Sequence, residues 1–153
     1  MEIDGALLER KQEVHCTLVA ARKAAQGGPL LEKRIMAAAR AHLQTTTVTF
    51  EGFTGEVRVC RKPDDEGRER ITVVAGVAIA GLTALWQAVR QICPDFKDPA
   101  LHVTLYKLPW DPYGISVNSA QEFDRYEHRD DLLSGLAAAV LPRSQPAEYT
   151  EGQ

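Results

Sequence analysis

The residues that could do chemistry occur in two copies of one short pattern, HCTL at residues 15–18 and HVTL at residues 102–105. Each copy lies in an apolar run typical of a strand, in which alternate side chains point to opposite faces. The His and Thr of each copy would then share one face, and their apolar neighbours would face a core. The chain holds four histidines, so two in the same short context indicate a shared purpose.

Two histidines that face one site can supply an acid and a base to the same reaction. The ordinary pKa of an imidazole is roughly 6.5, so one ring can be neutral while the other is protonated. Hydrolysis of a phosphodiester needs this division, because one group takes a proton from the attacking water and another gives a proton to the leaving oxygen. His15 and His102 are the candidate catalytic pair, and the sequence leaves open which of them is the base.

Other side chains near the motifs could bind the substrate. The hydroxyls of Thr17 and Thr104 follow the histidines by two residues and could hydrogen-bond the non-bridging phosphate oxygens. An aromatic ring one step beyond Thr104 on the expected face could stack on a base, and nearby cations could attract an anion. These further candidate contacts are Tyr106, Arg22, Lys23 and Lys107.

Structural and metal-binding roles are the alternatives for these residues. A single His on a strand is most often structural, and Thr is an ordinary strand residue, so the interpretation depends on the repetition of the pattern. A zinc site would use His15, Cys16 and His102, but Cys16 should face away from His15 in a strand. We therefore expect no metal and no cofactor.

The spacing of apolar residues predicts the elements that position the motifs. Alternation predicts one strand over residues 14–20 and a second over Leu101–Tyr106. A proline in the first turn and a helical stripe predict a helix over Pro29–Gln44, and another stripe predicts a helix over Leu82–Cys93. β-branched residues between these helices predict three strands, at Thr45–Phe50, Glu56–Lys62 and Arg70–Ile79, with a hairpin connection at residues 63–67.

The last third of the chain is expected to hold one strand, one helix and a tail. Residues Gly114–Val117 could form a short strand, and the Ser119-Ala120-Gln121-Glu122 sequence fits a capping box that begins a helix. This helix would run through Tyr126 towards Val140, with an interruption near Asp130 or Gly135. The polar, proline-containing residues 142–153 are expected to be disordered.

Length and composition favour one ordinary domain. The chain has 153 residues, of which 44% are hydrophobic, enough for a single core over residues 1–141. Its net charge of −3 argues against coating long nucleic acid, which needs many basic contacts. The three cysteines lack a CxxC spacing and favour reduced thiols, and no signal peptide or membrane span is apparent. We expect a cytoplasmic protein that does not enter a membrane.

The HCTL and HVTL motifs resemble the paired His-x-Thr-hydrophobic motifs of the two-histidine (2H) phosphoesterase superfamily. That superfamily includes RNA ligase/cyclic phosphodiesterases and phage enzymes that degrade cyclic oligonucleotide signals. The resemblance covers residues 13–108 and implies an α/β fold of the α+β kind, bilobal, with a central cleft. It also implies that His15 and His102 are catalytic and that Thr17 and Thr104 bind phosphate.

The chain departs from that family ahead of the first motif. Family members carry a strand and a helix there, whereas fourteen residues precede His15. One hypothesis is a permuted fold, in which residues 114–117 and the helix from Ser119 take the missing place. An N-terminally shortened reading frame and a strand supplied by a partner are the alternatives, and an exposed sheet edge would favour a homodimer.

The resemblance and the residues together predict a hydrolase. We expect a metal-independent phosphodiesterase that opens a 2′,3′-cyclic phosphate on a nucleotide or RNA end, or cleaves a small cyclic or 2′-5′ oligonucleotide. The alternative is a module that binds a nucleotide or RNA end in the same cleft without turnover. A third interpretation is an interaction subunit that a partner strand completes.

Overall fold

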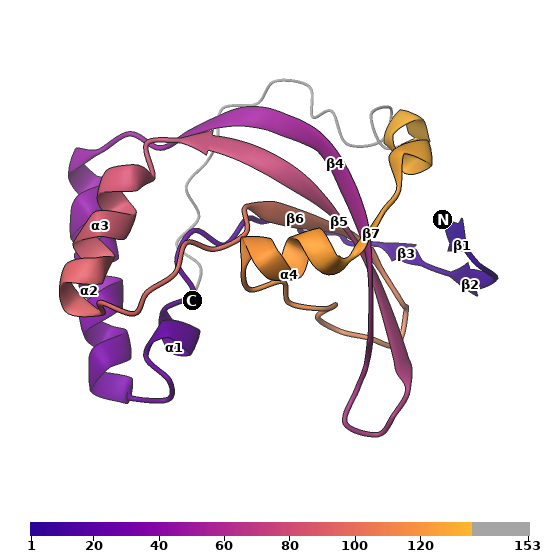
Figure 1. Cartoon of the computed structure of the whole chain (residues 1–153), viewed down its shortest axis with the longest axis horizontal. Coiled ribbons are helices and arrows are strands. Elements are labelled where there is room, and N and C mark those ends of the chain that lie inside the picture. The colour runs from indigo at the N-terminus through magenta and orange to yellow at the C-terminus, as the bar shows by residue number, and fades with distance from the viewer. Residues whose placement is uncertain (136–153) are drawn as a thin grey trace.

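The computed structural model describes residues 1–135, and residues 136–153 are not considered. The elements follow the order strand, helix, strand, helix, strand, helix along most of the chain (Figure 1). They are β1 (Glu2–Ile3), β2 (Ala6–Leu7), β3 (Glu9–Arg10), α1 (Ala21–Ala24), α2 (Pro29–Thr45), β4 (Thr49–Pro63), β5 (Glu69–Ala80), α3 (Thr83–Ile92), β6 (His102–Lys107), α4 (Ala120–Arg125), β7 (Glu127–His128) and the 3-10 helix η1 (Asp130–Leu132).

The fold is a mixed α+β fold with two antiparallel sheets, which confirms the coarse fold class expected from the sequence. The main sheet has five strands in the order β3-β6-β5-β4-β7, and β1 and β2 form a separate two-stranded sheet. Every pairing of strands in both sheets is antiparallel. Strand β6, which carries the second motif, therefore has a neighbour on each side.

The β4-β5 hairpin is the longest feature and provides the centre of the core. The run Ile71–Val77 is buried at every position, so β5 packs apolar side chains on both faces of the sheet. On one face Val73 packs with Val57 and Leu105, and on the other Val74 packs with Cys60. The buried centre holds β6 at a fixed place in the sheet.

Helices α2 and α3 lie side by side at one end of this hairpin, while β1 and β2 lie at the other (Figure 1). The predicted helical stripes are the buried faces: Ile35 of α2 and Val89 of α3 are fully buried in one cluster. Leu85 and Ala39 join the same helices in a neighbouring cluster. Both predicted helices are confirmed to within a residue at each end.

The predicted strand over residues 14–20 is wrong. The segment forms no ladder, because β3 stops pairing with β6 after Arg10. Alternation nevertheless persists as alternating exposure: His15 and Thr17 are exposed, whereas Cys16 and Leu18 are half-buried. The sequence pattern therefore predicted the inward side chains Cys16 and Leu18, but Val14 is exposed and Val19 packs against the core, and no partner strand forms.

Other boundaries also differ from the expectation. The two strands predicted at residues 45–50 and 56–62 form one strand, β4, whose register with β5 shifts at Phe50/Gly52 and Phe53/Val57. No strand forms at residues 114–117. Helix α4 begins at the predicted cap Ser119 but ends at Arg125, because the next residues become β7 and pair with β4. The predicted extension towards Val140 and the tail at 142–153 fall partly or wholly outside the described residues.

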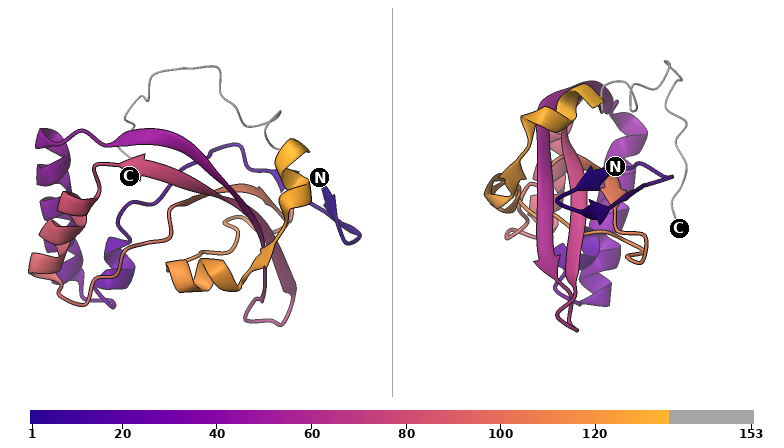
Figure 2. Two further views of the ribbon diagram at one scale, coloured as in Figure 1. Left: turned by 45° about the horizontal axis from the view of Figure 1, so that its top comes forward. Right: turned by 90° about the vertical axis from the view of Figure 1, so that its right-hand side faces the viewer.

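The permuted arrangement is wrong as well. It required α4 to pack near α2, but Phe123 of α4 packs with Cys60 and Val74 on the sheet. Figures 1 and 2 show α4 beside the middle of the sheet and apart from α2. Over residues 1–135, none of the helices combines the length and apolarity that a bilayer crossing would need.

Candidate active site

Strand β6 presents the second motif on one face and core residues on the other. Val103 and Leu105 are buried in the main core, whereas His102 and Thr104 are half-buried on the opposite side. The strand pairing places His102 across from Gly76, which has no side chain. The space over Gly76 is filled by Thr54 and Phe123, because an added Cβ would lie 2.5 Å from Thr54 Oγ1 and 3.6 Å from Phe123 Cζ.

The ring of His102 is fixed by one hydrogen bond. Its Nδ1 lies 2.7 Å from the carbonyl oxygen of Ala100. Because a carbonyl can only accept, the hydrogen is on Nδ1, and Nε2 carries the free lone pair in the neutral ring. The ring of Phe123, at 6.3 Å between centroids, packs beside it. His102 is thus oriented with Nε2 as its proton-exchanging atom.

The surroundings of His102 favour its neutral form over its charged form. Burial lowers the pKa of His102 below its ordinary value, because the charged ring loses hydration. The hydrogen bond to Ala100 and the negative charge of Glu122 oppose this effect, and the charge of His15 adds to it. A neutral imidazole at pH 7 is the form that can accept a proton.

The first motif lies next to the second without forming a strand. The N–H of Lys11 donates to the carbonyl of Leu105 at 2.8 Å, which continues the register of β3 on β6 for one more residue. Further along, the His102 backbone forms a hydrogen bond with the Cys16 thiol, and this bond partly offsets the rise in the Cys16 pKa that burial causes. Residues 11–16 therefore run beside β6, and His15 lies close enough to influence the charge of His102.

The structure brings three of the four motif residues to the same region with different exposure. His102 and Thr104 are half-buried, and His15 is exposed to solvent one residue before the Cys16 contact. Thr17 is also exposed, and no hydrogen bond of its hydroxyl is recorded among those of the described chain.

Tyr106 and Lys107 are placed away from the histidines. The register of β5 and β6 shifts between Val73 and Val74, so the alternation breaks after Thr104. Tyr106 is opposite Val73 and packs against the main core, on the other face from Thr104. Lys107 is buried and forms an ion pair with Glu9. Tyr106 thus contributes to the core and Lys107 to an ion pair, so each side chain has a structural role in this arrangement.

The two cationic candidates of α1 remain at the surface. Arg22 and Lys23 are exposed on this short helix, which follows the first motif. Lys23 lines a cavity between α1 and the loop that precedes β6. Arg22 is not among the residues that line it.

A loop held by a buried ion pair covers Thr104, and the sequence reasoning did not find it. Asp111 has a side chain that is 3% exposed, and it accepts hydrogen bonds from Arg70 Nε at 2.8 Å and from the N–H of Gly114 at 3.0 Å. Arg70 also donates to the carbonyl of Gly114. Nothing in the run Pro109-Trp110-Asp111-Pro112 indicates a partner forty-one residues earlier.

Gly114 is required where this loop meets the sheet. Its φ is +77°, and an added Cβ would lie 3.2 Å from Thr72 Oγ1 and 3.6 Å from Thr104 Cγ2. The next N–H, of Ile115, donates to Thr72 Oγ1 at 2.9 Å. The loop is therefore fixed against the same face of the sheet that carries Thr104.

Glu122 is a second residue whose role the sequence did not show. Its capping role was expected, and its N–H does donate to the capping oxygen, Ser119 Oγ, at 3.1 Å. Its carboxylate accepts from Asn118 N at 2.8 Å and from Tyr126 Oη at 3.3 Å, and its charge raises the pKa of His102. Only the packing of α4 on the sheet brings this carboxylate to the imidazole.

Comparisons with known proteins do not assign a family. A scan against protein-family models, a search of curated proteins and a search of solved structures each found no match to this chain. Within residues 1–135, no group of three or more His, Cys, Asp or Glu side chains is arranged to hold a metal ion. Any functional assignment therefore depends on the motifs and on their geometry.

Proposed function

We propose that this protein is a metal-independent phosphodiesterase of the two-histidine type. Its substrate would be a 2′,3′-cyclic nucleotide or RNA end, or a small cyclic or 2′-5′ oligonucleotide. One observation supports the proposal most: the two His-x-Thr-Leu segments, far apart in the chain, lie beside each other, with the Cys16 thiol of the first hydrogen-bonded to the His102 backbone of the second. Two imidazoles with different exposure can hold different protonation states at one pH.

The proposed division of labour follows from the surroundings of each ring. His102 is neutral and has a free Nε2, so it would take a proton from the attacking water as the water oxygen bonds to phosphorus. The P–O bond to the ribose oxygen breaks, and protonated His15 would donate its proton to that leaving oxygen. Exchange with solvent then restores both rings, and no other reactant is needed.

The threonines would bind the phosphate. Thr104 is on the same face of β6 as His102, two residues along, and Thr17 is exposed two residues after the exposed His15. A hydroxyl can donate to a non-bridging oxygen where negative charge accumulates in the transition state. Loss of either hydroxyl would then lower kcat with the fold intact.

A bilobal organisation with a cleft belongs to the same proposal. Separate hydrophobic clusters support it, because Ile35 and Val89 form one around α2 and α3, whereas Val73 and Leu105 form another on the sheet. The free thiols Cys16, Cys60 and Cys93 fit the reducing cytoplasm that we propose as its location.

Hydrolysis of a 2′,3′-cyclic nucleotide in the presence of a chelator tests the function. His15→Ala and His102→Ala should each lower kcat by a factor of about 10² or more. His102→Asn is a sharper variant, because its amide can still donate to Ala100 but cannot exchange a proton. His128→Ala is the matched control, since that exposed ring pairs with Asp130 on β7 and η1.

The outcomes separate catalysis from binding. Activity that survives in both His15→Ala and His102→Asn would end the proposal. Tight nucleotide binding by the unaltered protein, with no product after long incubation, would instead identify a module that binds without turnover. Circular dichroism of each variant shows whether a loss of activity follows from a loss of fold.

A further inference from the structure

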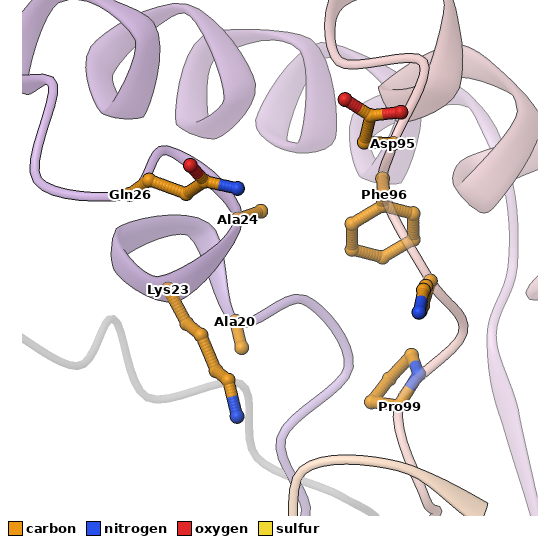
Figure 3. A pocket seen from close by; sticks show the side chains of 8 residues that line it. Ala20, Lys23, Ala24, Gln26, Asp95, Phe96 and Pro99 are labelled. Carbon is orange, nitrogen blue, oxygen red and sulfur yellow. The ribbon is translucent and has the colours of Figure 1, made fainter.

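A cavity of about 210 Å³ lies between α1 and the loop that joins α3 to β6 (Figure 3). Residues of α1 form one side, and residues of the loop form the other. The cavity is lined by Ala20, Lys23, Ala24, Gln26, Asp95, Phe96, Lys97 and Pro99. Sites for drug-sized ligands are larger, typically about 300–1,000 Å³, so this one suits a single nucleotide unit or part of one.

The lining combines an apolar wall with an excess of positive charge. Phe96 is 6% exposed and packs in the cluster of α1, α2 and α3, so it is a fixed part of the wall. Lys23 and Lys97 are exposed and bring two positive charges, against one negative charge from Asp95. The neighbouring Asp98 is engaged by Arg90 and adds little free negative charge. An apolar surface beside two ammonium groups is complementary to a nucleoside that carries a phosphate.

The residues that line the cavity are close along the chain to both motifs. Pro99 precedes Ala100, whose carbonyl holds the His102 ring. His102 follows Pro99 by three positions, so their Cα atoms are at most about 11 Å apart. Lys23 follows Thr17 by six residues, through α1. Each side of the cavity is therefore joined to one of the two motifs by a short stretch of chain.

We propose that this cavity is a subsite for a second, phosphate-bearing nucleotide unit of an oligonucleotide. Lys23 and Lys97 bind its phosphate, and the sugar or base lies against Ala24 and Pro99. The part of this inference that concerns turnover rests on the proposed function, because the first unit would occupy the histidine site. Its consequence is a preference for a dinucleotide ending in a 2′,3′-cyclic phosphate over a cyclic mononucleotide.

Equilibrium binding tests the subsite without turnover. The full chain carrying His15→Ala is titrated with two probes, a uridine dinucleotide ending in a cyclic phosphate and uridine 2′,3′-cyclic phosphate. Lys23→Gln and Lys97→Gln should each weaken dinucleotide binding by a factor of about 3, and together by about 10 at low salt. Mononucleotide binding should stay unchanged in these variants. Lys33→Gln is the matched control, because this exposed lysine of α2 is not in the lining.

The outcomes distinguish the subsite from the catalytic proposal. If the dinucleotide affinity is the same with and without the two lysines, or if both probes lose affinity equally, the subsite is overturned even if hydrolysis is found. Lysine-dependent dinucleotide binding supports it even if no hydrolysis is ever found, in which case the proposed function alone fails. Ala24→Leu fills the cavity without changing its charge, so it should weaken dinucleotide binding and leave mononucleotide binding unchanged. This result would distinguish a shaped site from a diffuse basic surface.

Discussion

One carboxylate accepts several of the hydrogen bonds that hold the loop against Thr104. Asp111 accepts two hydrogen bonds from Arg70, at 2.8 and 3.2 Å, and two from the N–H groups of Tyr113 and Gly114. Asp111→Ala removes all of them and leaves the Arg70 guanidinium, whose side chain is 23% exposed, without its main partner. We predict that this change destabilises the protein and frees the loop.

The expected cost is set by the burial of the pair. Removing one member of a buried ion pair typically costs about 3–5 kcal/mol, and the partial exposure of Arg70 places this case near 3 kcal/mol. Asp111→Asn keeps an oxygen for the backbone N–H groups but loses the charge, so about 2 kcal/mol is expected. Asp98→Ala is the control, because Asp98 pairs with Arg90 at the surface and should change the free energy of unfolding by less than about 1 kcal/mol.

The same carboxylate makes stability depend on pH. Burial alone would raise the pKa of Asp111, but hydrogen bonds from Arg70 and from two backbone amides outweigh it, so the pKa lies below its ordinary value. The contribution is therefore complete above the ordinary carboxyl pKa of roughly 3.9 and is lost as the pH falls through the lowered folded pKa. The difference in stability between the unaltered protein and Asp111→Asn should shrink over that acidic range.

Urea unfolding followed by circular dichroism, at pH 7 and at several acidic values, measures both effects. A loss below 1 kcal/mol for Asp111→Ala at pH 7 would refute the assignment of this pair as the loop's main anchor. So would a difference for Asp111→Asn that does not change with pH. Because the loop covers Thr104, the same variants should also lose phosphodiesterase activity if the proposed function holds.

Three further predictions follow from single contacts. Glu122→Gln removes a charge that raises the pKa of His102, so the acidic limb of the pH-activity profile should move to lower pH; an unchanged limb would contradict the influence of this carboxylate. Gly81→Ala should cost about 2–3 kcal/mol in urea unfolding, because φ is +89° and the new Cβ would lie 2.5 Å from the Thr47 carbonyl oxygen; a neutral effect would argue against this turn. Burial, with the negative charge of a nearby carboxylate, raises the pKa of the Cys60 thiol to about 12, so iodoacetamide at pH 8 should label it only as fast as the protein opens, and rapid labelling would contradict its burial.

The elements with strong local signals could be predicted from the sequence. Helix α2 begins at Pro29 and helix α3 shows a clear apolar stripe, so both were placed correctly. The β-branched run of β5 and the alternation of β6 were also found. In each case the residues that set the local pattern are the same residues that pack in the core.

The errors occurred where a distant partner decides the structure. Residues 14–20 alternate like a strand, but a strand needs a backbone ladder, and the backbone pairing with β6 on that side ends at Lys11. The helix that begins after Ser119 was expected to continue through residues 127–128. It ends before them, because Arg58 Nη1 donates to the carbonyl of Tyr126 and β7 pairs with β4. The pattern of apolar and polar residues within one segment cannot show whether a distant strand pairs with it.

The candidate site was predictable in its residues and not in its surroundings. Repetition of the motif pointed to His15 and His102, and alternation placed the threonines with them. The anchor at Ala100, the charge of Glu122 and the change of face before Tyr106 all depend on packing between segments. These tertiary features give the two imidazoles their different environments.

The most direct test of the central claim is the initial rate of 2′,3′-cyclic nucleotide hydrolysis in a chelator for the single and double histidine variants. We predict that His15→Ala and His102→Asn each lower kcat by a factor of about 10²–10⁴. The double variant should then be little worse than the poorer single one, because the two rings act in one step. No turnover by the unaltered protein, or folded single variants that keep its rate, would contradict the claim.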